Sequence, residues 1–268
     1  MVKLTHPAQT LLDNPDGFRI EIDEARQRAD IILDRPPLNV VSMPQRNQLR
    51  CAFEALDAHA AVRVIVVRAV GEHFSSGGDI KGFLEASAET VSKLAWNIAA
   101  PARCEKPVIA AARGYCFGVG FEISLACDFR IASETARYAL PEQKLGQIPG
   151  SGGSARLQKM VGITRTKDIV MRSRRITGKQ ALDWGIVTEC VADDELEKTT
   201  DALVDELVQF APLAQRTAKK LLNDTEDATL STAIELEGHA YSRLRSSDDF
   251  REGVTAFHSK RKPAFKGS

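Results

Sequence analysis

The sequence predicts an α/β protein (α+β in some schemes), and three observations support that prediction. Strand-like and helix-like segments alternate over residues 17–191, as in proteins whose helices cover a sheet. The stretch 62–70, VRVIVVRAV, is a nearly continuous run of β-branched residues, which is typical of a strand buried on both faces. From Asp194 onward the apolar residues recur at helical spacing.

The first elements that the sequence predicts are a hairpin and a helix. Residues 17–25, GFRIEIDEA, alternate apolar and polar side chains, as a half-buried strand does. Residues 29–37 form a second strand that ends at a proline pair, and the short connection 24–28 predicts a hairpin. Pro44 suits the first turn of the next helix. The buried face of that helix has the i, i+3, i+4, i+7 spacing: Leu49, Ala52, Phe53 and Leu56.

Strands and glycine-rich turns alternate through the middle of the chain. Residues 73–83, HFSSGGDIKGF, form a glycine-rich turn after the buried strand. Residues 106–115 predict another buried strand, which leads into a glycine pair and a helix within residues 114–128. The next segments are two short strands, a Gly/Pro-rich loop entering a helix, and a helix–glycine–strand unit: 128–140, 141–157 and 177–191.

The C-terminal segment predicts helices broken at Pro212 and Asn223, followed by a basic end, HSKRKPAFK. We therefore divide the chain into a core that carries the strands, residues 1–195, and a C-terminal helical region, residues 196–268.

Composition and charge count against several classes of protein. The 36 basic and 36 acidic residues give a formal net charge of zero, whereas proteins that bind nucleic acid or acidic membranes usually have a basic excess. The five cysteines show neither a CxxC pair nor metal-ligand spacing, which predicts reduced, mostly buried thiols. The N-terminal residues do not resemble a signal peptide, and no stretch approaches the ~20 apolar residues of a membrane span. We expect a cytoplasmic protein.

Glu122 is out of place in the apolar stretch GYCFGVGFEISLACD, residues 114–128. A carboxylate costs several kcal/mol to bury unless it is paired or hydrogen-bonded. Glu122 therefore either lies on an exposed face or is held inside the protein for a reason.

Two glycine-rich turns lie between a strand and a helix, at Gly118–Gly120 and at Ser76–Asp79. Glycine lets the backbone approach a ligand closely, and the first N–H groups of a helix have no partner within it. Two such turns could each donate one N–H to an oxyanion. Turns of this kind are also common for packing reasons alone.

Glu142 follows twenty residues after Glu122, with two short strands predicted between them. That length of chain can leave a site and return to it, so the two carboxylates could act as base and acid on one water. Alternatively, Glu142 caps a helix or faces solvent, as most glutamates do.

The longest motifs are GYCFGVGFEISLACDFRIAS, residues 114–133, and YALPEQKLGQIPGSGGSARL, residues 138–157. Together with GGDIKGF and GVTAFHSKRKPAFK, they resemble the enoyl-CoA hydratase/isomerase (crotonase) family over residues 17–266. The resemblance implies a crotonase-like spiral of ββα units that forms two nearly perpendicular sheets. It also implies that the helical C-terminal region makes homotrimers, which often pair into hexamers.

The resemblance further implies an acyl-CoA substrate whose thioester oxygen is held by two backbone N–H groups, here those of Gly78 and Val119. Both glutamates that hydratases of this family use are present, as Glu122 and Glu142. This pair implies reversible syn addition of water to a 2-enoyl-CoA, which gives a 3-hydroxyacyl-CoA. Glu142 would exchange the C2 proton, Glu122 would hold the water, and the N–H of Gly150 would help orient it.

For coenzyme A, the resemblance points to Lys81 and to Tyr241, Phe257 and Lys260, the last three often belonging to a neighbouring subunit. It implies no metal or redox cofactor, since coenzyme A is part of the substrate. Without the resemblance, the basic end of the chain would be interpreted as a solvated tail.

Two alternatives remain open. The first is another reaction of the family: double-bond isomerisation, or hydration of a cyclic or branched acyl group. The unusual context of SSGGD, Val119 and Gln147 favours it. The second is a non-catalytic relative that binds RNA, against which the zero net charge and the intact glutamate pair both count.

Overall fold

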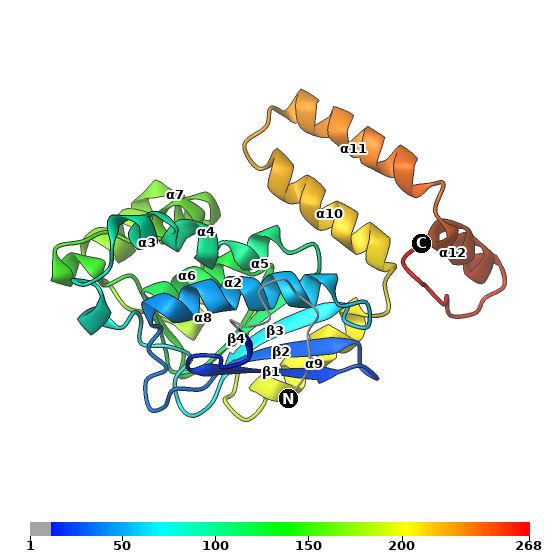
Figure 1. Ribbon diagram of the computed structural model, residues 1–268. Helices are drawn as coiled ribbons and strands as arrows, with labels where there is room; N and C mark the ends of the chain where they lie inside the picture. Colours follow the sequence, from blue (N-terminus) through cyan, green and yellow to red (C-terminus); the bar gives the residue numbers. More distant parts are fainter. Residues whose placement is uncertain (1–11) are drawn as a thin grey trace.

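A six-stranded sheet forms the centre of the computed structural model, which describes residues 12–268 (Figure 1). The strand order is β1–β2–β3–β4–β6–β9, and every neighbouring pair is parallel except the antiparallel hairpin of β1 and β2. The predicted hairpin is therefore confirmed. The strands of this sheet are β1 (Phe18–Asp23), β2 (Arg28–Leu33), β3 (Val64–Ala69), β4 (Val108–Ala112), β6 (Phe129–Ser133) and β9 (Glu189–Val191).

A second, three-stranded sheet consists of β5 (Tyr115–Phe117), β7 (Arg137–Ala139) and β8 (Ile176–Thr177). The single strand predicted over residues 106–115 was wrong, because the chain divides there between β4 of the first sheet and β5 of the second. Gly114, with φ of +54°, makes the turn, and a Cβ there would lie 2.1 Å from the Glu72 carbonyl oxygen. Only glycine fits this position without displacing the backbone.

Helix α2 (Met43–Ala58) packs on one face of the six-stranded sheet, as Figure 1 shows. Ser42 and Gln45 form a capping box at its start, and Pro44 lies in its first turn as predicted. The predicted apolar stripe is buried in the main core against Ile31, Ile65 and Val67.

Helix α9 (Leu196–Leu207) covers the opposite face of that sheet. Its apolar side chains cluster with Val64, Val66 and Ile109, which alternate along the strands with the residues that face α2. The β-branched run at β3 is therefore buried on both faces, as expected. The helices between β3 and α9 are α3 (Ala88–Ser92), α4 (Leu94–Ile98), α5 (Ala100–Arg103), α6 (Val119–Ala126), α7 (Gly153–Met171) and α8 (Gly178–Asp183).

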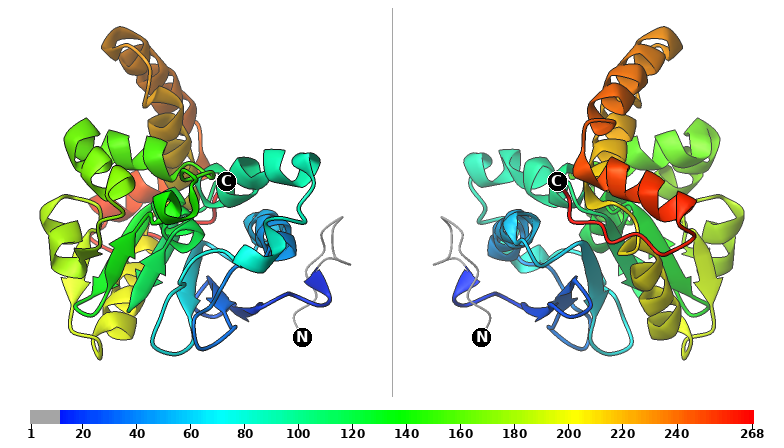
Figure 2. Two further views of the ribbon diagram at one scale, coloured as in Figure 1. Left: turned by 90° about the vertical axis from the view of Figure 1, so that its left-hand side faces the viewer. Right: turned by 90° about the vertical axis from the view of Figure 1, so that its right-hand side faces the viewer.

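The last three helices, α10 (Pro212–Thr225), α11 (Leu230–Leu244) and α12 (Asp248–His258), extend away from the sheet (Figures 1 and 2). Lys219 anchors α10, because its buried amino group bonds to the carbonyls of Pro101 and Lys106 and pairs with Asp128 at 2.7 Å. The division of the chain at residue 195 stays a prediction. Within residues 12–268, no helix combines the length and apolar character that a membrane span needs.

Candidate active site

The two glycine-rich turns lie against each other. Isolated parallel bridges join Val41 to Gly78 and Ser75 to Cys116, which draws the first turn to the end of β5. A Cβ on Gly118 would lie 3.6 Å from the Gly77 Cα atom. The hydrogen bonds described for the chain leave the N–H groups of Gly78 and Val119 without an acceptor. Two adjacent turns therefore each offer a free donor, which is what an oxyanion site requires.

Glu122 lies in the first turn of α6 and is only 3% exposed. Its Oε1 accepts hydrogen bonds from the Ser151 N–H at 2.7 Å and from the Gly153 N–H at 3.1 Å. A Cβ on Gly153 would lie 3.0 Å from the Glu122 Cγ atom, so the loop needs glycine to approach so closely. Glu122 is therefore buried and held in one orientation, which answers the question that its apolar surroundings raise.

Glu142 begins the short 3₁₀ helix η2 (Glu142–Leu145) and turns its carboxyl group toward the glycine turns. Its Oε1 lies 3.2 Å from the position of a Cβ on Gly118. Its Oε2 is buried and has no hydrogen-bond partner in the described chain. Burial, with the nearby charge of Glu122, raises the pKa of Glu142 to about 7, against the opposing effects of its own backbone N–H and of Arg46. A carboxyl group with this pKa can exchange a proton near neutral pH.

The guanidinium of Arg46 is a further charged group in the site. Arg46 lies on α2, is 4% exposed, and its Nη2 lies 2.8 Å from the position of a Cβ on Gly78. The ring of Phe83 packs against it, with the Arg46 Cζ atom 5.5 Å from the ring centroid. Burial lowers the pKa of Arg46, while the charges of Glu122 and Glu142 act to raise it.

Arg46 was not predicted from the sequence, although the sequence contains a signal for it. The residue precedes Leu49 by three positions and Phe53 by seven, so it falls on the apolar stripe of α2. A charged residue in a buried stripe calls for an explanation, just as Glu122 did.

The structure thus brings together Gly78, Val119, Glu122 and Glu142. Gly150 is exposed and immediately precedes Ser151, whose N–H binds Glu122. Its assignment stays a prediction.

The residues predicted to bind coenzyme A are spread over the molecule. Lys81 lies on η1 (Ile80–Gly82), which Asp79 caps by accepting the Lys81 N–H at 3.2 Å. Tyr241 on α11 and Phe257 on α12 are 61% and 81% exposed. Lys260 follows α12, at the other end of the molecule from α3 and α7 (Figure 1). One chain does not bring these groups together, and their roles stay predictions.

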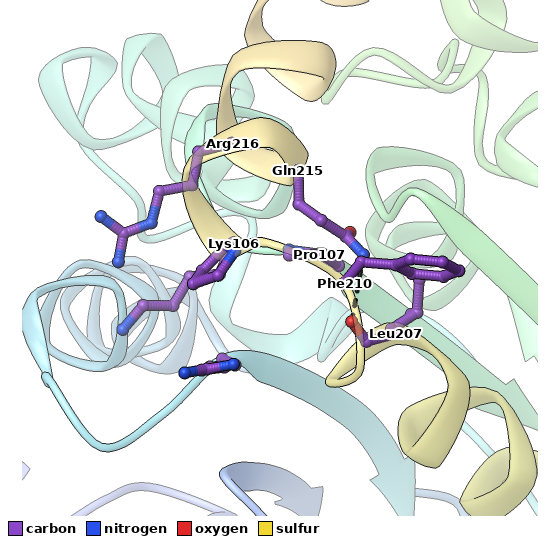
Figure 3. Close-up of a pocket in the computed structure, with 8 residues that line it drawn as sticks. Lys106, Pro107, Leu207, Phe210, Gln215 and Arg216 are labelled. Carbon is purple, nitrogen blue, oxygen red and sulfur yellow. Dashed lines mark hydrogen bonds between the residues drawn. The ribbon is translucent and has the colours of Figure 1, made fainter. Parts of the chain in front are cut away.

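A hollow lies where the chain passes from α9 into α10 (Figure 3). Two of its polar side chains hold other segments: Lys106 bonds to the carbonyls of Leu56 and His59, and Gln215 to that of Leu207. This hollow contains none of the predicted site residues. Among residues 12–268, no three His, Cys, Asp or Glu side chains cluster as metal ligands.

Comparison with known proteins identifies the family of this chain. The family model for enoyl-CoA hydratase/isomerase matches residues 25–268. The chain belongs to the enoyl-CoA hydratase/isomerase family. The expected crotonase-like α/β fold is confirmed by the enoyl-CoA hydratase structure from Bacillus anthracis, which has a TM-score of 0.89 and 31% identity. That match covers 94% of this chain and 100% of the other.

Relatives of known name lie in the same family. The carnitinyl-CoA dehydratase of Salmonella arizonae is 38% identical over 251 residues, which span 89% of this chain and 94% of that protein. The carnitinyl-CoA dehydratase of Proteus mirabilis is 35% identical over 246 residues, with the same shares covered. The chain is therefore an enzyme of the hydro-lyase type that acts on an acyl-CoA.

Proposed function

We propose that this enzyme catalyses the reversible syn addition of water to a 2-enoyl-CoA, giving a 3-hydroxyacyl-CoA. The observation that supports this most strongly is the unlike pair of Glu122 and Glu142 beside two free N–H donors. Glu122 is held by two backbone N–H groups, whereas Glu142 has a buried, unpartnered oxygen and a pKa raised to about 7. Two carboxyl groups in unlike environments are suited to opposite proton-transfer roles.

In the proposed reaction, Glu122 takes a proton from water as the water oxygen bonds to C3 of the enoyl group. Glu142 gives its proton to C2, so one proton enters the pair and one leaves it. Negative charge develops on the thioester oxygen between these events, and the N–H groups of Gly78 and Val119 stabilise it there. Removing one such donor from an enzyme typically costs about 10²–10³-fold in kcat. The reaction as written needs no metal or redox cofactor.

We further propose that coenzyme A contacts Lys81 of one chain and Tyr241, Phe257 and Lys260 of a neighbouring chain in a trimer or hexamer. The exposed apolar side chains of the last three helices support such assembly, because isolated domains rarely leave so many uncovered. These side chains are Leu222, Leu230, Ile234, Leu236, Tyr241, Phe250, Val254 and Phe257.

A second candidate is dehydration of a 3-hydroxyacyl-CoA with a polar acyl group. The identity of 38% to a carnitinyl-CoA dehydratase favours it. The proton transfers are the same ones in the opposite direction, so only the acyl group separates the two candidates.

A substrate panel in ¹⁸O-labelled water tests the proposal. Purified enzyme is offered 2-enoyl-CoA, 3-enoyl-CoA and 3-hydroxyacyl-CoA thioesters, and the products are analysed by mass spectrometry. We expect the label on the C3 hydroxyl of products from 2-enoyl thioesters. Double-bond migration without incorporation of the label would instead assign the enzyme to isomerisation and overturn the proposal.

A further inference from the structure

Arg46 is a buried cation whose hydrogen-bond donors are not used by the protein. Its side chain is 4% exposed, and its Nε atom is buried without an acceptor. Within residues 12–268, no hydrogen bond or ion pair joins its guanidinium to another side chain, and the Phe83 ring packs against it. Buried charged groups normally find partners, because leaving donors unsatisfied is costly. The buried Nε donor lacks an acceptor, and the Nη donors have no partner among the described residues either, so the guanidinium is open to an acceptor that the protein itself does not supply.

The location of Arg46 indicates where that acceptor would come from. A Cβ at position 78 would approach Arg46 Nη2 to 2.8 Å and Phe83 Cζ to 2.7 Å. The glycine at this position thus leaves room for the guanidinium beside the predicted oxyanion donor. A substrate whose thioester oxygen reached the Gly78 N–H would bring its acyl group close to Arg46.

Charge balance with the two glutamates does not explain why Arg46 is buried in the site. The two hydrogen bonds to Glu122 come from the loop before α7, and Arg156, which bonds to the Ser151 carbonyl in that loop, also lies near its charge. With Glu142 protonated, as the proposed hydration requires, two arginines face one carboxylate. The site then carries one positive charge in excess, which would attract an anionic acyl group and disfavour a cationic one.

We propose that Arg46 determines acyl specificity by donating hydrogen bonds from its guanidinium to a carboxylate carried on the acyl chain of the substrate. This rests on the proposed function, because it extends the same site. The planar fork of arginine matches a carboxylate in a bidentate geometry that lysine does not reproduce. The Phe83 ring, packed against the guanidinium, would hold its plane in place.

The test compares thioesters that differ only in the terminal group. Wild-type enzyme is given fumaryl-, glutaconyl- and 2-hexenedioyl-CoA, each beside its neutral counterpart of equal chain length, together with 4-trimethylammonio-2-butenoyl-CoA. We expect at least one carboxylate-bearing thioester to exceed its counterpart in kcat/KM by roughly 10- to 100-fold, as hydrogen bonds between charged groups allow. The cationic thioester should be the poorest substrate. Equal values for the charged and neutral members of every pair would overturn the proposal.

Variants separate a specificity role from a structural one. Arg46→Leu should abolish the preference for the carboxylate, and Arg46→Lys should keep only part of it. Arg50→Leu is the matched control, because Arg50 lies one turn further along α2 and pairs with Glu54 outside the site; it should keep the preference in full. If Arg46→Leu lowers both members of a pair equally, the residue is structural and the proposal is wrong.

Binding distinguishes failure of this inference from failure of the proposed function. Calorimetry with glutaryl-CoA and valeryl-CoA, which cannot be hydrated, measures recognition without turnover. Tighter binding of glutaryl-CoA that Arg46→Leu removes would support the inference even if no thioester were hydrated. Equal binding of the two by wild-type enzyme would overturn it even if hydration were observed.

Discussion

Two short stretches of the chain each supply a glutamate to the site, and the two stretches differ in how far they are buried. All eight residues of α6, Glu122 among them, are buried. In residues 141–150, which contain Glu142, Pro149 alone is buried. The same side-chain type is thus presented once from the core and once from a surface loop.

The difference explains how one reaction can use two identical side chains. The α6 stretch fixes Glu122, because two N–H groups of the loop before α7 bind one of its oxygens. The loop stretch gives the Glu142 Oε2 no partner and partly removes water from it, so the raised pKa lets this group carry the transferable proton. The fixed orientation of Glu122 suits it to position the water, and the near-neutral pKa of Glu142 suits it to exchange a proton.

The largest effect should come from removing either carboxylate. Glu122→Gln and Glu142→Gln should each lower kcat for hydration by about 10²–10⁴-fold, the usual contribution of an acid or base, while binding of a saturated acyl-CoA is largely kept. Steady-state kinetics and calorimetry measure the two quantities. Unchanged turnover in either variant would remove that residue from the mechanism.

The next effect concerns the fit between Glu122 and the loop that binds it. Gly153→Ala would place a Cβ 3.1 Å from the Glu122 Oε1 and 3.2 Å from the Leu140 Cδ2. The displaced carboxylate should lower kcat/KM by roughly 10–100-fold, because small misplacements of reacting groups are costly. Gly82→Ala is the matched control, since a Cβ there meets nothing within 4 Å. Equal activity of the two variants would show that the position of Glu122 tolerates change.

The pH dependence of kcat/KM should show the ionisation of Glu142. If Glu142 delivers the proton, kcat/KM for hydration falls about tenfold per pH unit above about 7, where this group loses its proton. Dehydration should show the same pH dependence of kcat/KM. In both directions the reactive enzyme carries one proton on the glutamate pair, because the addition of water moves a proton from Glu142 to Glu122 without changing the total. The charge of Arg46 lowers this pKa, so Arg46→Leu should move the alkaline limb upward. A profile that stays flat to pH 9 would exclude Glu142 as the proton donor.

The smallest effects should appear in thermal stability. Glu122→Leu leaves the N–H groups of Ser151 and Gly153 without an acceptor, which should lower Tm by roughly 5 °C. The pKa of Glu142 is raised from 4.5 to about 7, so this group lowers the stability of the folded state as the pH rises through that window, and the loss is complete above pH 7. Glu142→Gln at pH 8 should therefore keep or slightly raise Tm. Calorimetric melts at pH 6 and pH 8 measure both. A large loss of Tm in Glu142→Gln would show that this side chain is structural.

The sequence predicted the fold well where local patterns decide it. The alternation in the first strand, the helix with Pro44 in its first turn and the β-branched strand β3 all have signals within a few residues. The division of residues 106–115 between two sheets could not be predicted in this way, because it depends on the contact between Gly114 and Glu72 that tertiary structure creates.

The site divides in the same manner. Glu122 was identified because its apolar neighbours make a charge conspicuous, and Glu142 through the family motif. Two further features depend on how separate segments pack, so the spacing of residues along the sequence does not predict them. They are the backbone N–H groups that bind Glu122 and the position of the Arg46 guanidinium beside Gly78. Arg46 interrupts the apolar stripe of α2, and a charged residue in a buried stripe is the sequence signal for it.

The most direct test of the different roles of Glu122 and Glu142 is exchange of the C2 protons of butyryl-CoA in deuterated water, followed by ¹H NMR. This reaction needs proton transfer at C2 and stabilisation of the enolate, and no water addition. We predict that Glu122→Gln keeps exchange within about tenfold of wild type, whereas Glu142→Gln loses about 10²–10⁴-fold. Loss of exchange in Glu122→Gln with retention in Glu142→Gln would contradict the account.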